Sequence, residues 1–260
     1  MKRIISLLMA CTLILSSLVS CKKKSDEDAG TSKTDAPCVI TVDFDFSCDD
    51  DVISVIFEQL ENNKTVIYLD NGKFKAENNS AISYNGENVY KDTYVVIDGM
   101  IYEHFSYSLN GVILEDDRVK APISGEESDR FLKELCLFGG ISASGFSEIE
   151  NESLDGCDVS TYRNPDTDNK IVLEKMMVSM LEGYCDLVSI TDATVTVKET
   201  EDGYSEAVVS GSYEVTILEV KYNLSVSIRL SFDYTQSFDI TAPTDEGEYV
   251  AVEIKSIIGE

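Results

Sequence analysis

The sequence predicts a mostly β protein of the α+β class: a curled antiparallel sheet, or unclosed barrel, with about three helices covering its concave face. Three observations support this prediction. Six Asn-Gly or Asp-Gly pairs are spread along the chain, one long run alternates apolar with polar residues, and three segments repeat apolar residues at helical spacing.

The six dipeptides are typical of two-residue β-turns, because Asn or Asp followed by Gly favours the positive φ angles that these turns need. Several are flanked by strand-like runs, as Asp98-Gly99 is by residues 94–97 and 100–109. One or two such pairs could arise by chance, whereas six indicate an antiparallel meander. The pairs are Asn71-Gly72, Asn85-Gly86, Asp98-Gly99, Asn110-Gly111, Asp155-Gly156 and Asp202-Gly203.

The clearest strand is expected in the last third of the chain. From Tyr222 to Tyr234 apolar and polar residues alternate over thirteen residues, which is the period of a strand with one buried face. Similar stripes precede it at residues 193–197 and 207–217. The phase slips between Ile217 and Val220, which predicts either a bulge or a tight turn. Long strands of this kind strengthen the twist until the sheet curls, and its apolar face then needs a cover.

Three segments interrupt the β pattern with helical spacing. They are residues 52–60, 131–138 and 172–184. Acidic residues 49–51 precede the first and suit a helix N-terminus. Ser124 and Glu127 precede the second in a capping-box pattern. The third presents a broad apolar face, so we expect these segments to cover the concave side of the sheet.

The first twenty residues have the parts of an export signal. Lys2 and Arg3 supply the positive start, and residues 4–19 form an apolar run too short and too rich in Ser and Thr for a permanent span. The run ends in Leu18-Val19-Ser20-Cys21, which resembles the lipobox of bacterial lipoproteins. We therefore expect fatty acyl groups, such as palmitate, to be attached at Cys21. The alternative is an ordinary secretory signal followed by a chance cysteine.

The expected organisation is a signal peptide at 1–20, a lipid-anchored flexible tether at 21–37 and one curled-sheet domain at 38–260. Alanine is the only aliphatic residue in 22–37, and a coil of this length reaches roughly 20–25 Å. Lys22 to Lys24 either assist the anchor at anionic headgroups or simply keep the tether soluble. The anchor would hold the domain on the extracytoplasmic face of the cell membrane.

Composition excludes several kinds of partner and site. The chain has 48 Asp and Glu against 21 Lys and Arg, a net charge of −27, which argues against nucleic acid because nucleic acid is bound through clustered cations. No C-x-x-C motif occurs, which argues against thiol redox chemistry and thiolate zinc. Five cysteines follow the lipobox cysteine, so at most two disulfides can form, with pairing left open. They are Cys38, Cys48, Cys136, Cys157 and Cys185.

No pattern predicts catalysis or a cofactor, and we expect the protein not to be an enzyme. His104 is the only histidine, and the near match to a serine-hydrolase elbow at 140–145 has Ser144 where the second glycine belongs. The oxygen-rich run from Asp166 to Asn169 lacks the glycine and glutamate of a calcium loop. A helix cap and a turn explain that run more simply than a metal site does.

At this point the chain resembles the LolA/LppX-type group of bacterial lipoproteins and lipoprotein carriers. The resemblance covers about residues 65–243 loosely. It is carried by the strand 94–97 with the turn Asp98-Gly99, the returning strand 100–102, the late Phe232-Asp233-Tyr234, and residues 240–243. It implies an unclosed β-barrel with helices in its mouth, which holds acyl chains or lipids in an apolar concavity.

Two functions fit these patterns. In the first, a membrane-anchored extracytoplasmic lipoprotein binds an apolar or amphipathic ligand, such as lipid, between the sheet and its helices. In the second, a non-enzymatic surface interaction module, structural or regulatory, binds no small molecule. A continuous apolar cavity under the helices would favour the first. Its expected lining is Val96, Ile101, Phe105, Met176, Met177 and Met180, the methionines being flexible enough to adapt to varied apolar ligands.

Overall fold

The computed structural model describes most of the predicted domain. The described residues are 37–50, 54, 63–83, 86–128, 131, 143–154, 156–180, 187–201, 203–217 and 219–258. The expected signal peptide, Cys21 and the tether up to residue 36 lie outside this set. So do most of the expected helices 52–60 and 131–138, as well as Cys136, Cys185 and the side chains of Met176 and Met180.

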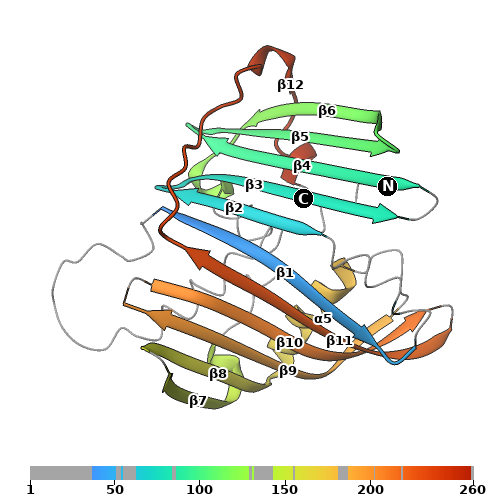
Figure 1. Cartoon of the computed structure of the whole chain (residues 1–260), viewed down its shortest axis with the longest axis vertical. Helices are drawn as coiled ribbons and strands as arrows, with labels where there is room; N and C mark the ends of the chain where they lie inside the picture. Colours follow the sequence, from blue (N-terminus) through green and yellow to red (C-terminus); the bar gives the residue numbers. More distant parts are fainter. Residues whose placement is uncertain are drawn as a thin grey trace.

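Twelve strands form one open sheet, in the order β12-β6-β5-β4-β3-β2-β1-β11-β10-β9-β8-β7 (Figure 1). Every described pairing is antiparallel except the short parallel contact of β12 with β6. The prediction of a mostly β, largely antiparallel sheet is confirmed. The strands are β1 Cys38–Cys48, β2 Lys64–Asp70, β3 Lys73–Ser83, β4 Glu87–Ile97, β5 Met100–Leu109, β6 Val112–Pro122, β7 Phe146–Leu154, β8 Cys157–Pro165, β9 Leu187–Thr200, β10 Gly203–Ile217, β11 Val220–Asp233 and β12 Val250–Ala251.

Asn71-Gly72, Asp98-Gly99 and Asn110-Gly111 each join one strand to the next, as predicted. Gly86 and Gly156 directly precede a strand and Gly203 begins one, whereas Asn85, Asp155 and Asp202 lie outside the described residues. Asp98 and Gly99 have φ angles of +51° and +75°, the left-handed pair that a tight hairpin needs. Asn71-Gly72 and Asn110-Gly111 adopt the same conformation. The phase slip before β11 is a tight turn and not a bulge, because Ile217 pairs directly with Val220.

The long alternation predicted near the end of the chain is strand β11. Its buried residues, Leu224, Val226, Ile228 and Leu230, alternate with more exposed ones. Pairing with β1 and β10 places β11 in the interior of the sheet. Side chains of a strand point alternately to its two faces, so the buried set defines an inner face and the other set an outer face.

The helices are short and capped as the sequence predicts. Helix α5, Thr167–Met180, begins five residues before the expected start, because Asp166 Oδ1 accepts a hydrogen bond from the Asn169 backbone N–H at 2.9 Å. Ser124 and Glu127 form the expected capping box, with the Glu127 N–H donating to Ser124 Oγ at 3.2 Å. Among the described residues, no helix is both long enough and apolar enough to cross a membrane.

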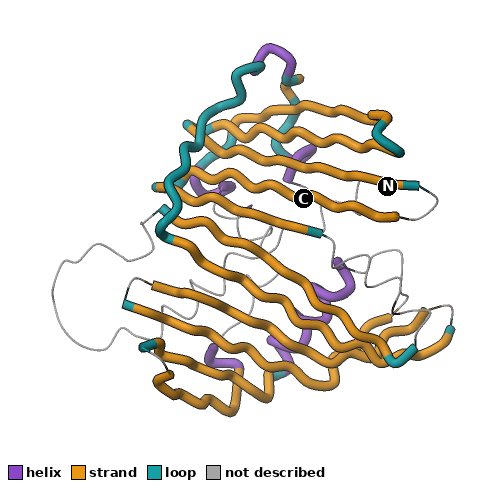
Figure 2. Tube along the Cα trace, in the orientation of Figure 1, coloured by secondary structure: helices purple, strands orange, loops and turns teal. Residues whose placement is uncertain are grey.

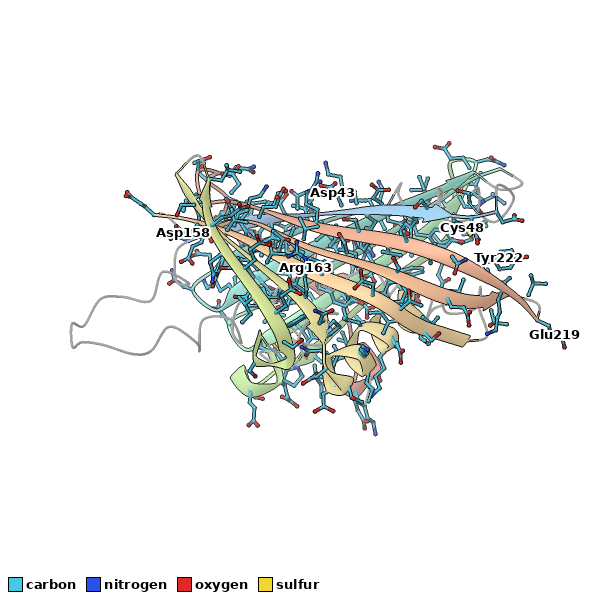
Figure 3. The ribbon with its side chains drawn as sticks, turned by 90° about the horizontal axis from the view of Figure 1, so that it is seen from below. Asp43, Cys48, Asp158, Arg163, Glu219 and Tyr222 are labelled. Carbon is cyan, nitrogen blue, oxygen red and sulfur yellow. The ribbon has the colours of Figure 1, made fainter. Side chains whose placement is uncertain are left out.

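The main core lies between the inner face of the sheet and α5. Leu173 and Met177 of α5 are fully buried there against residues from most of the strands. In the view from below, the helices lie on one side of the curled sheet, and Asp43 lies on the other (Figure 3). The inner face is therefore the covered, concave face that the sequence predicts.

The chain after β11 covers part of the outer face as well. It runs as a loop across one end of the sheet (Figure 2), where Ile240 is buried against Val95, Ile97 and Tyr102. It then forms the turn η5, Glu246–Glu248, and β12, which lies beside the β6 edge. The last helix, α6 Lys255–Ile258, packs its isoleucines against the inner core. This wrapping of the β6 edge has no periodic signal in the sequence and was not predicted from it.

Candidate functional site

The candidate site is the inner face of strands β2–β6. Of the residues predicted to line a cavity, Val96, Ile101 and Met177 belong to one buried core, with exposed fractions of 4%, 0% and 0%. Phe105 lies on the same face of β5 as Ile101, two positions beyond Glu103, and is half-buried. The described part of the chain thus brings three of the six predicted residues together and leaves Phe105 at the margin.

The apolar end of this face lies beside the Asp98-Gly99 turn. Register pairs Leu69 with Phe74, Phe74 with Val96 and Val96 with Ile101, so one apolar row crosses β2, β3, β4 and β5. Phe131 covers that row, with its ring 6.2 Å from Phe74 and 5.4 Å from Tyr94 between centroids. Aromatic packing of this kind keeps water from the apolar end.

Farther along the same strands, the inner face becomes polar while remaining buried. Register aligns Thr65 with Asn78, and Asn78 with Asp92. The Thr65 hydroxyl lies 3.5 Å from Asn78 Oδ1 and donates to it. Five polar residues with exposed fractions of 5% or less make up this polar end: Asn63, Thr65, Asn78, Ser80 and Asp92. Sequence reasoning missed all five, because polar residues at inward positions look like surface residues.

Asp92, Tyr94 and Glu103 form the acidic part of the polar end. The Tyr94 hydroxyl donates a hydrogen bond to Glu103 Oε1 at 3.0 Å, and it also lies within hydrogen-bonding reach of the Asp92 carboxyl. Burial raises the pKa of Asp92 well above its usual range, and the nearby Glu103 charge raises it further. The hydrogen bond from Tyr94 favours the carboxylate form and opposes part of this rise in the pKa of Asp92.

Two buried side chains at the polar end have polar atoms without a hydrogen-bond partner. They are Asp92, through Oδ1, and Asn63, through both atoms of its amide. A buried polar atom left unpaired costs about 1–3 kcal/mol, and such atoms are uncommon in folded proteins. These three atoms are therefore the part of the inner face that has unused capacity to bind a polar group.

The lysines of strands β2–β4 do not face this acidic group. Lys64, Lys73, Lys75 and Lys91 alternate with the buried positions of their strands and so lie on the outer face. Asp117 of β6 pairs with Phe105 and extends the acidic character of the inner face. On strands β2–β5, the described inner face carries the carboxyl groups of Asp92 and Glu103.

A separate polar depression of about 300 Å³ lies across the middle strands. Small hydroxyl side chains on β1, β9, β10 and β11 leave this hollow, and Asp45 and Asp192 bring negative charge to it. Its lining is Asp45, Ser47, Asp192, Thr194, Ser210, Gly211, Ser212, Ser225, Val226 and Ser227. Most of these residues alternate with core residues, so the depression belongs mainly to the outer face.

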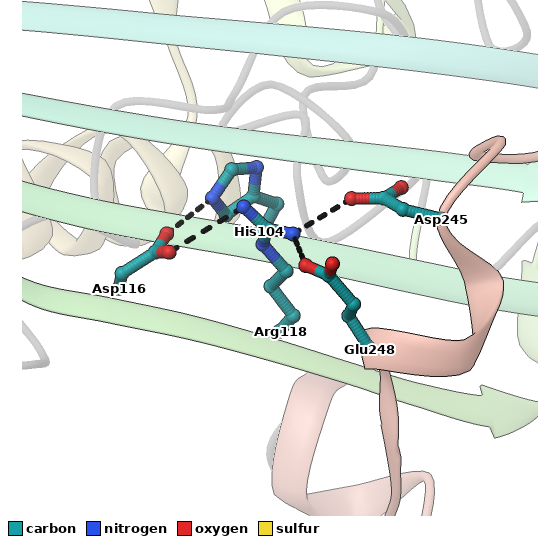
Figure 4. A network of polar contacts seen from close by, with 5 residues as sticks. All are labelled: His104, Asp116, Arg118, Asp245 and Glu248. Carbon is teal, nitrogen blue, oxygen red and sulfur yellow. Dashed lines mark hydrogen bonds and ion pairs between the residues drawn. The ribbon is translucent and has the colours of Figure 1, made fainter.

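The C-terminal segment is held to the outer face by a charged network around Arg118 (Figure 4). Arg118 Nη1 donates to Asp245 Oδ2 at 2.7 Å and also to Glu248. His104 Nε2 lies 2.6 Å from Asp116 Oδ1, so the single histidine is a strand-surface residue, as expected. Each of these side chains has a partner within the network. The network therefore explains how the C-terminal segment is fixed to the sheet, and it indicates no catalytic reaction.

The calcium-loop, serine-hydrolase and disulfide patterns considered from the sequence can be compared with the described residues. Asp166 to Asn169 caps α5, as expected, and no group of three or more His, Cys, Asp or Glu side chains in the described ranges is arranged to hold a metal ion. Ser144 lies in the short turn η4, Ala143–Gly145, ahead of β7. Cys38, Cys48 and Cys157 are free thiols.

Comparisons with known proteins add no functional assignment. No protein-family model and no curated protein matches the chain. Among solved structures it is similar to a β-barrel-like protein of domain of unknown function DUF1849 from Brucella abortus, at 8% identity, over 76% of this chain and 98% of that one, with a TM-score of 0.29. A CurK dehydratase mutant matches at 9% identity over 86% and 83%, with a TM-score of 0.13. Such scores are too low to carry an argument on fold or function.

Proposed function

We propose that this protein is a membrane-anchored extracytoplasmic lipoprotein that binds an amphipathic ligand, such as a lipid, on the inner face of its curled sheet. The observation that supports this best is the division of that face. One end is a buried apolar row through Val96 and Ile101, and the other end is a buried polar group around Asp92. A ligand with an apolar chain and a polar head matches both ends.

Burial of an alkyl chain would supply most of the affinity, at about 0.8 kcal/mol for each buried methylene group. In this proposal Val96, Ile101 and Met177 contact the chain, and Phe105 lies opposite Asp92 at the polar end. Met176 and Met180 belong to the same helix and complete the proposed lining. Unbranched thioether side chains can adjust to chains of different shape.

The proposed anchor would keep the domain close to a source of such ligands. Strand β1 begins at Cys38, directly after the expected tether, and Cys21 is the proposed acceptor of the lipid. A flexible tether of this length reaches roughly 20–25 Å. The domain would then stand clear of the headgroups of its own membrane and still meet lipids that leave it.

The test is to recover the ligand with the protein. The chain from residue 21, carrying Cys21→Ser and exported behind an ordinary cleavable leader, can be purified from its host without detergent. Native mass spectrometry should show an added mass that organic extraction removes. Met176→Asp and Phe105→Asp should each abolish the added mass while circular dichroism stays unchanged.

Val112→Asp is the matched control, since Val112 is 61% exposed and lies away from the inner face core. It makes the same chemical change and should retain the ligand. If the protein carried no added mass and took up no fatty acid, alcohol or amine at micromolar concentration, the carrier function would be wrong.

A second candidate function is the non-enzymatic surface interaction module. The observation in its favour is three consecutive exposed apolar residues, Val112, Ile113 and Leu114, with exposed fractions of 61%, 67% and 57%. They lie on the part of β6 that β12 does not pair with. Exposed apolar strand edges are frequent sites of protein contact. Ile113→Lys should then weaken co-purification of a partner without changing ligand content.

A further inference from the structure

The C-terminal segment occupies only part of the sheet edge that β6 forms (Figure 1). Strand β12 pairs with β6 at Val119 and Lys120 alone. Along residues 112–117, none of the described strands pairs with β6 on this side. Six residues of strand extend over roughly 20 Å at about 3.3 Å each, which is the length of a typical strand. This stretch, the free edge, is therefore long enough to accept one more strand.

The occupied part of the edge shows that β6 binds an added strand through its backbone. The Val252 N–H donates to the Lys120 carbonyl at 2.9 Å, so the backbone groups of Lys120 point to this side of the sheet. These groups alternate sides along a strand with a period of two. Asp116 and Arg118 therefore present their N–H and C=O groups in the same direction, in line with β12.

The side chains at the start of the free edge are apolar. Val112, Ile113 and Leu114 are consecutive, and each is more than half exposed. Successive side chains of a strand point to opposite faces, so this run exposes apolar groups on both faces of the sheet margin. An exposed apolar strand edge is a ready template for pairing with another chain.

The opposite edge of the sheet shows how the same chain discourages such pairing. Strand β7 is the outermost strand there and carries Glu148, Glu150 and Glu152 at alternate positions. Charged side chains on an edge strand oppose pairing with other chains. The exposed Ile149 stands between two of these acids, whereas no charge interrupts residues 112–114. The contrast indicates that the free edge of β6 is the one suited to accept a strand.

Charge decides which strand can use this edge. The whole chain carries a net charge of −27, so a second copy is repelled and a basic chain is attracted. Asp116 lies on the free edge, and the acidic turn η5 lies beside the next residues of β6. Arg118 is already bound to acids of that segment, Asp245 and Glu248. The partner that fits is a strand with both apolar and basic side chains.

From these observations we propose that residues 112–117 bind an extended segment of a partner protein, in which apolar residues alternate with lysine or arginine, as an added strand in line with β12. The apolar residues of the segment would cover Val112 to Leu114. This inference rests on the second candidate function, the surface interaction module, and is independent of ligand binding on the inner face. It adds the mode of binding and the chemical class of the partner.

The test uses fluorescent synthetic peptides about as long as the free edge and the Cys21→Ser chain from residue 21. One peptide alternates valine with lysine, and a second alternates valine with glutamate. A third repeats the lysine peptide with methyl groups on alternate backbone nitrogens, which removes the N–H donors of one side. Fluorescence anisotropy should show binding of the lysine peptide and none of the glutamate peptide. The methylated peptide should bind about tenfold more weakly, because several backbone hydrogen bonds are lost.

Ile113→Lys should weaken binding of the lysine peptide by about tenfold or more, since it removes an aliphatic contact and adds a cation opposite a basic strand. Ile149→Lys is the matched control, because it makes the same change at an exposed isoleucine of the other edge strand. It should leave the affinity within about twofold. If Ile113→Lys failed to fold, Ile113→Ser would decide, and it too should weaken binding.

The outcomes separate this proposal from the two functions. Failure of the lysine peptide to bind, equal binding of the glutamate or methylated peptide, or equal losses in the Ile113 and Ile149 variants would reject the basic-strand site. A dimer in sedimentation that Ile113→Lys dissociated would make the edge an interface between copies and would also reject it. If Ile113→Lys lost a co-purified partner while no peptide bound, the interaction module would stand without this class of partner. A protein that bound the lysine peptide but carried no lipid would contradict the carrier function alone.

Discussion

Tyr94 of β4 donates a hydrogen bond to Glu103 Oε1 of β5 across 3.0 Å, on the buried face of the sheet. Cross-strand neighbours in an antiparallel pair lie close enough for such bonds, and register places these two residues directly opposite each other. The same hydroxyl lies beside Asp92 two positions earlier. The three side chains therefore act as one group, in which the protonation of one changes the others.

This group makes stability depend on pH in a direction that can be measured. The folded state raises the pKa of Asp92, through burial first and then the Glu103 charge, so the folded chain binds this proton more tightly than the unfolded chain does. Linkage then requires that this residue's contribution to stability be full below the unfolded pKa of about 3.9 and be lost as pH rises toward the folded pKa. The sign is opposite to that of a salt-bridged aspartate.

Asp92→Asn should abolish this loss of stability at higher pH, since an amide of nearly the same shape carries no charge. We expect the free energy of unfolding at neutral pH to rise by about 1–3 kcal/mol, the usual cost of an unpaired buried group. Urea unfolding of the wild type and the variant at pH 5 and pH 7 measures the effect. Asp43→Asn should change little, and equal midpoints for Asp92→Asn and the wild type at both pH values would contradict the prediction.

Arg118 should control how firmly the C-terminal segment is held. Its guanidinium donates to Asp245 and Glu248 from a side chain that is 23% exposed. Removing it by Arg118→Ala leaves Asp245 and Glu248 without this cation, at a cost of about 1–3 kcal/mol for a charged hydrogen-bonded group. We expect faster amide hydrogen exchange in residues 236–252 and earlier proteolysis there.

The control for this prediction is Arg163→Ala. Arg163 also pairs with two acids, Glu148 and Glu150, but on the β7–β8 hairpin at the other edge of the sheet. Its loss should leave exchange in residues 236–252 unchanged. Equal protection in the Arg118 variant and the wild type would show that the buried contacts of Ile240 hold the segment without the network.

The free cysteines should differ in reactivity. Burial raises the pKa of the Cys38 thiol to about 11, and only the thiolate reacts with alkylating reagents. Cys48 and Cys157 are more exposed. Iodoacetamide at pH 8 should label Cys48 and Cys157 in the native protein and Cys38 only after unfolding, as counted by peptide mass spectrometry.

The length of strand β1 excludes a disulfide between Cys38 and Cys48. The two residues are the ends of β1, which has eleven residues, so they lie roughly 33 Å apart at about 3.3 Å per residue. The Cα atoms of bridged cysteines lie within about 7 Å.

The labelling prediction has a clear contrary outcome. If Cys38 in the native protein reacted with iodoacetamide as fast as Cys157, the burial of the first residue of β1 would be contradicted.

The hairpins were predictable because their signal is local. Asn-Gly and Asp-Gly pairs specify a backbone conformation by themselves, and the inward residues of β11 follow a strict period of two. The cover over Val95 and Tyr102 was not predictable in this way. Phe238, Ile240 and Tyr249 lie in an irregular segment, and irregular backbone gives contacting residues no common period in the sequence.

The polar end of the candidate site was missed for a related reason. Asn78 and Asp92 occupy inward positions of β3 and β4, where period-two reasoning expects apolar side chains. A sequence pattern assigns such residues to the surface or to a turn, because a buried polar group is the exception. Only the register of three strands, β2, β3 and β4, shows that Thr65, Asn78 and Asp92 form one buried row.

The proposed anchor rests on one thiol. Cys21 ends the pattern Leu18-Val19-Ser20-Cys21 at the close of the apolar leader, and serine at that position cannot form the thioether that a lipoprotein carries. Cys21→Ser should therefore leave the protein as an unprocessed precursor or release it without lipid. Metabolic labelling with a palmitate analogue, together with phase separation in detergent, measures both properties. Cys11→Ser, inside the leader, is the matched control and should be labelled like the wild type. A Cys21→Ser protein that was processed, labelled and still partitioned with membranes would show that the lipid, and with it the position of the domain beside the membrane, depends on another residue.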